Sequence, residues 1–237
     1  MLKIWYRRML QGIFRGLFRL LTRLEVSGTE NIPLEGGFIF STNHLSVIDP
    51  PLIFGWLKRD DATTLVADKH YKNLFYRWLL NSVDGIWINR EETDFKALRA
   101  ARNHLEEGGV LGIAPEGTRS PTGALIQGKT GVAYLADKAK VPVLPAAITG
   151  TESAIKEVFK LQRPRLTFQI GELLYLPPVD RKNRDVALKR NTDELMCHIA
   201  AMLPDQYRGV YRDHPRLQAL LASEKEKPRI GEEIVLT

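Results

Sequence analysis

Cysteine and long apolar runs are scarce in this sequence. Its 237 residues include one cysteine, Cys197, which excludes an internal disulfide and a paired-cysteine metal site. No stretch approaches the roughly 18–20 uninterrupted apolar residues that a membrane-spanning helix needs. The first residues also lack the apolar core and the small-residue cleavage site of a signal peptide. We therefore expect a chain that is neither exported nor threaded through a membrane.

Two common catalytic signatures are missing as well. The sequence contains no G-x-S-x-G turn and no G-x-G-x-x-G fingerprint. These absences argue against a hydrolase with a serine nucleophile and against a dinucleotide-binding enzyme.

Acidic residues are absent from the first 24 positions. These positions hold six basic residues: Lys3, Arg7, Arg8, Arg15, Arg19 and Arg23. The net charge of the whole chain is +6, so residues 25–237 are balanced, with 28 charges of each sign. A nucleic-acid-binding domain spreads positive charge over its folded surface. We therefore expect no nucleic acid partner. Instead, we expect residues 1–24 to contact an anionic surface.

Residues 1–24 have the periodicity of an amphipathic helix. At 100° per residue, apolar side chains gather on one side and Arg8, Arg15, Arg19 and Arg23 on the other. A terminal helix packed on the domain, with its arginines solvated, would have a similar pattern. We favour an interfacial helix on anionic lipid, because a packed helix has no need of an all-cationic polar side and each basic residue near such a bilayer contributes roughly 1 kcal/mol.

After this arm, short apolar runs alternate with helical patterns. The runs predict strands at residues 38–42, 64–67, 86–89, 110–114, 143–148 and 166–170. The patterns predict helices at residues 51–57, 72–80, 93–107, 130–139 and 186–203. This alternation is typical of an α/β fold with a mostly parallel or mixed sheet flanked by helices. We expect one domain over residues 25–211 and a polar tail over residues 212–237.

The first candidate catalytic group combines His44 with Asp49. His44 directly follows a predicted strand, where α/β proteins commonly place active-site residues. The two side chains can meet only if the backbone turns between them, and the Asp49-Pro50 step favours such a turn. A carboxylate on one ring nitrogen would leave the other to take a proton from a hydroxyl. The alternative is that Asp49 only caps a helix while His44 packs locally.

The second candidate group is Pro115-Glu116-Gly117-Thr118-Arg119-Ser120, which also follows a predicted strand. The glycine allows close approach of a ligand, and the arginine offers a planar fork for phosphate oxygens. A polar turn with Arg119 in a surface ion pair is the alternative. Residues 85–90, which end on Arg90, and the proline-bracketed run at residues 141–148 are weaker candidates.

Taken together and in this order, the four segments resemble the ordered blocks of the glycerolipid acyltransferase family, over residues 25–210. The N-H-x-S-x-x-D pattern of that family matches residues 43–49, and its P-E-G-T-R-S pattern matches residues 115–120. Within residues 85–90, Trp87, Ile88 and Arg90 match the [FW]-[IV]-x-R part of a third pattern, and V-P-[IV]-x-P matches residues 141–145. The resemblance implies an O-acyltransferase of phospholipid biosynthesis.

The resemblance also implies residue roles. His44 would be the general base on the acceptor hydroxyl, and Asp49 would orient it. Arg90, Glu116, Gly117, Thr118 and Arg119 would bind the acceptor glycerophosphate. Lys69 matches a further lysine of the family, although His70 stands where many members carry an acidic residue and a proline usual nearby is missing.

The substrates and the location follow from the same resemblance. The acceptor would be 1-acyl-glycerol-3-phosphate, and the donor an acyl thioester on coenzyme A or acyl carrier protein, with no other cofactor and no metal. Acylation of another lyso-lipid, such as lyso-ornithine lipid or a lysophospholipid, is an alternative, and non-catalytic lipid binding is a third. Residues 1–24 would hold the enzyme at the cytoplasmic face of the membrane as a peripheral or monotopic protein.

Overall fold

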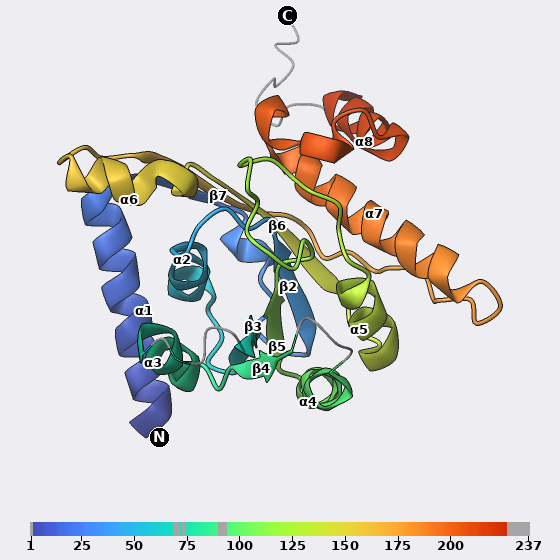
Figure 1. Ribbon diagram of the computed structural model, residues 1–237, viewed down its shortest axis with the longest axis horizontal. Helices are drawn as coiled ribbons and strands as arrows, with labels where there is room; N and C mark the ends of the chain where they lie inside the picture. Colours follow the sequence, from blue (N-terminus) through green and yellow to red (C-terminus); the bar gives the residue numbers. More distant parts are fainter. Residues whose placement is uncertain (1, 69–71, 73, 90–93, 227–237) are drawn as a thin grey trace, which may run out of the picture.

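The protein is built around a mixed seven-stranded sheet in a computed structural model that describes residues 2–68, 72, 74–89 and 94–226 (Figure 1). The strands are β1 (Arg23–Ser27), β2 (Phe38–Thr42), β3 (Ala62–Ala67), β4 (Ile86–Ile88), β5 (Val110–Ile113), β6 (Val143–Thr149) and β7 (Arg165–Ile170). Their order across the sheet is β1-β7-β6-β2-β5-β3-β4. All neighbours are parallel except β6 and β7.

Helices cover both faces of this sheet. They are α1 (Leu2–Leu21), α2 (Asp49–Trp56), α3 (Leu74–Ser82), α4 (Phe95–Glu106), α5 (Gly131–Ala139), α6 (Thr151–Phe159), α7 (Arg184–Met202) and α8 (Pro215–Glu226). Helices α1 and α2 lie on one side, and α4, α5 and α7 lie on the other (Figure 1). The α/β fold expected from the sequence is therefore confirmed.

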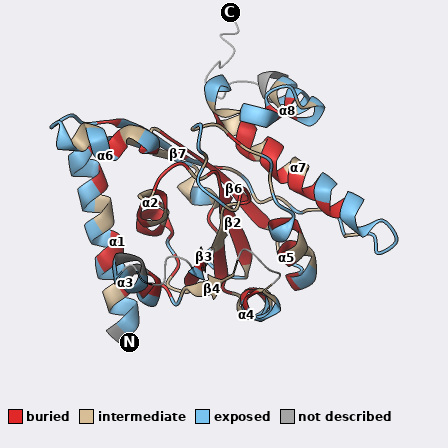
Figure 2. Cartoon of the chain, in the orientation of Figure 1, coloured by how far each residue is buried: buried red, intermediate tan, exposed pale blue. Residues whose placement is uncertain are grey.

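The central strand β2 separates two apolar cores. Phe38 and Phe40 pack with residues of α1 and α2, whereas Ile39 between them packs with residues of α4, α5 and α7. Because successive side chains of a strand point to opposite faces, a strand covered on both sides can be apolar at consecutive positions, as β2 is at its first three. Figure 2 shows the buried residues along the sheet and on the inward sides of the helices.

Three elements were not predicted from the sequence. Strand β1 and helix α6 were missed although both are periodic, because the residues of β1 alternate between polar and apolar side chains and α6 is amphipathic. The expected boundary at residue 24 falls inside β1. Helix α8 corrects the expectation of a polar tail from residue 212, because it lies within that segment. Its Leu217 is fully buried in the core beside α7, and Arg216 pairs with Glu194 of that helix at 2.7 Å.

Helix α1 packs on the domain and also has an exposed apolar side. It packs on α2, with Leu10 and Phe18 buried. Its basic side is only partly free, because Lys3 and Arg7 pair with Asp84 and Arg8 pairs with Asp60. The remaining side of α1 is exposed and apolar, with Trp5, Met9, Ile13, Leu17 and Leu20 at its surface. None of the described helices combines the length and the apolarity that crossing a membrane requires.

Candidate active site

The candidate residues come together at one edge of the sheet. Strands β2, β5, β3 and β4 are neighbours and run parallel, so their carboxyl ends lie at the same edge, where α/β sheets bind ligands. The His44 segment follows β2, and the Glu116 segment follows β5. Asn43 fixes the start of the first segment, because its side-chain amide exchanges two hydrogen bonds, of 2.9 and 2.8 Å, with the backbone of Ile148 on β6.

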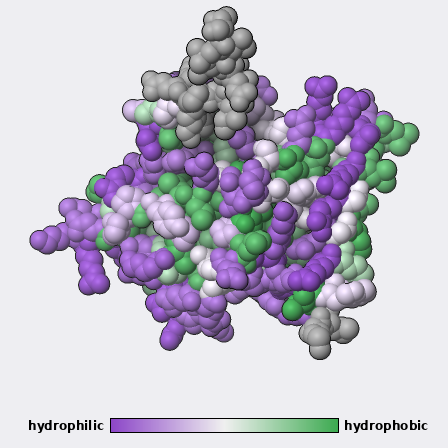
Figure 3. All heavy atoms as spheres, turned by 180° about the vertical axis from the view of Figure 1, so that it is seen from behind, coloured by the Kyte–Doolittle hydropathy of each residue, from purple (hydrophilic) through white to green (hydrophobic). Residues whose placement is uncertain are grey.

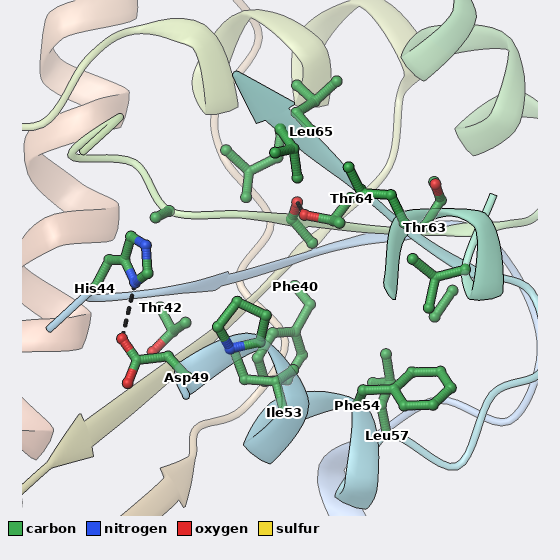
Figure 4. A pocket seen from close by; sticks show the side chains of 18 of the residues that line it. Phe40, Thr42, His44, Asp49, Ile53, Phe54, Leu57, Thr63, Thr64 and Leu65 are labelled. Carbon is green, nitrogen blue, oxygen red and sulfur yellow. Dashed lines mark hydrogen bonds and ion pairs between the residues drawn. The ribbon is translucent and has the colours of Figure 1, made fainter. Parts of the chain in front are cut away.

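His44 and Asp49 form a hydrogen-bonded pair. The Nδ1 atom of His44 lies 2.8 Å from Oδ2 of Asp49, and the same oxygen accepts the backbone N–H groups of Leu45 and Ser46 at 2.7 Å each. These bonds hold the turn that the sequence required between the two residues. Asp49 is in the first turn of α2 and is 1% exposed. Figure 4 shows the second ring nitrogen of His44 turned away from the carboxylate.

Thr151 completes the surroundings of Asp49. Its Oγ1 donates to Oδ1 of Asp49 at 2.6 Å, and the residue is fully buried at the start of α6. Sequence reasoning missed this contact, because the two residues lie 102 positions apart. Only the strand order could have predicted it, because Thr151 follows β6 and the segment of Asp49 follows β2, which is the neighbour of β6 in the sheet. Both carboxylate oxygens of Asp49 are thus held in place.

Glu116 has a different position from the one that the resemblance implies. Its carboxylate is buried, and its two oxygens accept the backbone N–H groups of His44 and Ile126 at 3.0 Å each. Burial raises the pKa of this carboxyl, although the two amides act in the opposite direction. Ser120 N–H also donates to the carbonyl of His44 at 2.8 Å. Glu116 therefore ties the two motif segments together and does not face an open acceptor site.

The next three residues of this segment lie at the open end of the site. Gly117 has a left-handed backbone with φ of 70°, and Thr118 and Arg119 are exposed and line the same pocket as His44. Lys69 and Arg90, the other two predicted binding residues, lie outside the described residues.

Lys129 is a cation that the prediction missed. A Cβ added to Gly117 would lie 3.0 Å from Cδ of Lys129 and 3.2 Å from its Nζ, so this side chain covers the glycine. Residues 123–130 match the G-x-x-x-x-G-K-T pattern of phosphate-binding loops, which could have indicated the lysine. The match is not such a loop, because the backbone N–H groups of residues 125, 126, 128 and 129 all donate to other parts of the protein.

An apolar pocket begins at His44. Beyond the polar end it is lined by Ile53 and Phe54 of α2, by Leu57 directly after that helix, and by Leu65 and other residues of β3. Figure 4 shows His44 and Asp49 at one side and these apolar side chains at the other. A base, exposed cations and an apolar recess suit a reaction on a molecule with a hydroxyl, an anionic group and a hydrocarbon chain. Among the residues described, no cluster of three or more His, Cys, Asp or Glu could hold a metal ion.

Several known proteins are similar to this chain. A family model described as Acyltransferase matches residues 23–149. The 1-acyl-sn-glycerol-3-phosphate acyltransferase of Bacillus subtilis is 27% identical over 152 residues, which are 64% of this chain and 74% of the relative. The enzyme of the same name from Pseudomonas aeruginosa is 29% identical over 147 residues, which are 61% of this chain and 52% of that relative.

A solved structure is similar as well. The crystal structure of the 1-acyl-sn-glycerophosphate acyltransferase of Thermotoga maritima superposes with a TM-score of 0.61 and 28% sequence identity. The match covers 80% of this chain and 79% of that one.

Proposed function

The chain belongs to the acyltransferase family, and from this membership we propose that it acylates the free hydroxyl of 1-acyl-glycerol-3-phosphate to make phosphatidic acid. The family predicted from the four sequence motifs is confirmed, and the protein is an O-acyltransferase. The observation that carries the proposal for the site is the 2.8 Å contact between His44 and a fully hydrogen-bonded Asp49 at the mouth of an apolar pocket.

In the proposed reaction His44 is the general base. Its Nε2 takes the proton from the acceptor hydroxyl while that oxygen attacks the thioester carbon. The carbon–sulfur bond breaks, and the departing thiolate takes the proton back from the imidazolium. Asp49 holds the ring through Nδ1 and stabilises its charged form. No covalent enzyme intermediate is needed, since the acceptor oxygen attacks directly.

Exposed cations would bind the phosphate of the acceptor. Arg119 has the planar fork that suits phosphate oxygens, and Thr118 beside it adds a hydroxyl. Lys129, whose side chain lies against Gly117, adds a second positive charge. We assign Lys69 and Arg90 to the same acceptor site on the family resemblance alone.

The apolar pocket would take the fatty acyl chain. Its walls are aliphatic and aromatic side chains of α2 and β3, which favour burial of a hydrocarbon over contact with a polar headgroup. The donor would be an acyl thioester of coenzyme A or acyl carrier protein, and the polar carrier would remain outside the pocket.

We propose that α1 lies on an anionic membrane surface. Its exposed apolar side chains follow one face of the helix, and Arg15 and Arg19 lie at the border of that face. A monotopic position at the cytoplasmic face would bring the site to a substrate whose hydrocarbon chain resides in the bilayer.

An acyl-transfer assay across lyso-acceptors tests the proposed function. With one acyl donor, 1-acyl-glycerol-3-phosphate should be the preferred acceptor over lyso-ornithine lipid and lysophospholipids with larger headgroups. His44→Ala should lower kcat by roughly 10²- to 10⁴-fold, the usual contribution of a general base, with an unchanged melting temperature. A His44→Ala enzyme with the wild-type rate would rule out the assigned base, and a different preferred acceptor would rule out the assigned substrate.

A further inference from the structure

We propose that the tip of α6, defined as Ile155, Phe159 and Leu161, is a second lipid-contact surface that enters the headgroup region of an anionic bilayer. The inference rests on the proposed function only in placing the substrate in a bilayer. It concerns residues of the catalytic domain itself, separate from the arm at residues 1–24.

The tip exposes large apolar side chains at the end of a helix. Phe159 is 85% exposed and Leu161 is 96% exposed, and Ile155 lies one helical turn before Phe159 on the same side. A single exposed apolar residue is ordinary on a protein surface, but a cluster on a projecting element indicates a binding surface. In Figure 3, which shows the molecule from behind, hydrophobic atoms gather along the edge that α1 and α6 form.

The backbone at Leu161 makes its side chain more unusual. Leu161 has φ of 58°, and it donates to Val158 O at 2.9 Å while Gln162 donates to Glu157 O at 3.0 Å. This is the Schellman ending of a helix, in which the left-handed position normally holds glycine. A bulky side chain at this position makes the left-handed backbone conformation less stable. Because Leu161 is almost fully exposed, no contact within the folded chain compensates for that strain. Stability of the fold alone would favour glycine at position 161. The leucine found there therefore points to a partner outside the chain.

The charges around the tip select an anionic partner. Residues 151–165 carry four basic side chains and two acidic ones. The basic ones are Lys156, Lys160, Arg163 and Arg165, and all are exposed. An apolar tip in a segment with an excess of exposed basic residues is the pattern of surfaces that bind anionic lipid. Because the tip projects outward, it suits a fluid bilayer better than a second protein, which would need a matching hollow.

The tip is joined to the end of α1. Arg163 Nη2 donates to the carbonyl oxygens of Arg19 and Thr22 at 2.7 Å each, and Arg23 N–H donates to Pro164 O at 2.8 Å. Figure 1 shows α6 lying across this end of α1. The apolar tip therefore continues the exposed apolar face of α1, whose last residues include Leu20. Contacts of two different elements with the bilayer would fix the orientation of the domain. With α1 alone on the surface, the domain could still rotate about the helix axis.

The test compares a double variant, Phe159→Ser with Leu161→Gly, with Val186→Ser as a matched control. Val186 is similarly exposed but lies on α7, away from α1 and α6. The measurement is partitioning of the full chain onto phosphatidylcholine vesicles that contain about one third phosphatidylglycerol. Losing two apolar insertions should weaken partitioning by about tenfold or more, while Val186→Ser binds like the wild type. Leu161→Gly alone should not lower the melting temperature, because glycine suits the left-handed backbone.

The outcomes separate this inference from the proposed function. Loss of vesicle binding in the double variant, with activity on a water-soluble short-chain acceptor retained, supports the tip as a lipid contact. Partitioning equal to that of the control overturns it, whatever the acyl-transfer assay shows. If the wild-type chain is a dimer without vesicles and the double variant is a monomer, the tip binds a second copy and the proposal is also overturned. His44→Ala should bind vesicles like the wild type.

Discussion

At the residue scale, Asp49 is the fixed point of the site. Its two oxygens accept four hydrogen bonds, from His44, Leu45, Ser46 and Thr151. The carboxylate cannot rotate without breaking several of them, so the imidazole is oriented before substrate arrives. Such preorganisation is the condition for efficient proton transfer. In the proposed reaction, the hydrogen bonds to Asp49 therefore contribute to the rate by positioning His44, although Leu45, Ser46 and Thr151 do not contact substrate.

Thr151 provides the sharpest test of this arrangement. Thr151→Val keeps the shape of the side chain but removes the donor to Oδ1 of Asp49, and a hydrogen bond to a charged group contributes about 1.5–3 kcal/mol. We expect kcat to fall by about tenfold or more with little change in the acceptor KM. Thr151→Ser restores the hydroxyl and should recover most of kcat. Equal losses of kcat in the valine and serine variants would contradict a positioning role.

At the element scale, the helices differ in how visible they are in the sequence. Helix α4 has a clear amphipathic pattern, with Ala101 and Leu105 buried, and it was predicted almost to its ends. Helix α8 was missed because its pattern is weak and its composition polar. Its place is set by a few contacts with α7, above all the burial of Leu217 and the pairing of Arg216 with Glu194. These contacts join elements that no local pattern connects.

The packing of α8 can be tested through Leu217. Leu217→Ala should lower the free energy of unfolding by about 2–4 kcal/mol, because it leaves a cavity in a closed part of the core. Urea denaturation of purified protein measures this change. Val210→Ala, at an exposed position close by in the sequence, should shift the free energy by less than about 0.5 kcal/mol. A negligible effect of Leu217→Ala would mean that α8 does not pack as described.

At the scale of the whole molecule, the sheet was largely predictable and the site only partly so. Buried parallel strands contain short continuous apolar runs, such as the first three residues of β2, which a sequence displays directly. The motifs likewise located His44, Asp49 and Arg119. The contributions of Thr151 and Lys129, and the buried position of Glu116, depend on which loops the strand order brings together. That order follows from the assembled sheet, since no local periodicity encodes it.

The two sides of α1 affect how membrane binding should be tested. Deleting residues 1–24 would remove Leu10 and Phe18 from the core and cut into β1, so loss of binding would be confounded with unfolding. Replacing Ile13 and Leu17 with serine changes only exposed positions. We expect this variant to keep its melting temperature and to lose about tenfold or more of its partitioning onto anionic vesicles. Unchanged partitioning would mean that α1 does not touch lipid.

The position of α6 has a further consequence for the direction of the reaction. Its nine residues span about 13 Å, with Thr151 hydrogen-bonded to Asp49 at one end and the apolar tip at the other. With the tip in the bilayer, the imidazole stands above the layer of headgroups, so a lipid must rise out of its leaflet to react. Each methylene withdrawn from the hydrocarbon costs about 0.8 kcal/mol, and the apolar pocket assigned to the acyl chain of the donor offsets this cost for that chain only. A product with two chains would have no pocket for its second chain, so transfer of both chains into the bilayer would favour release of the product.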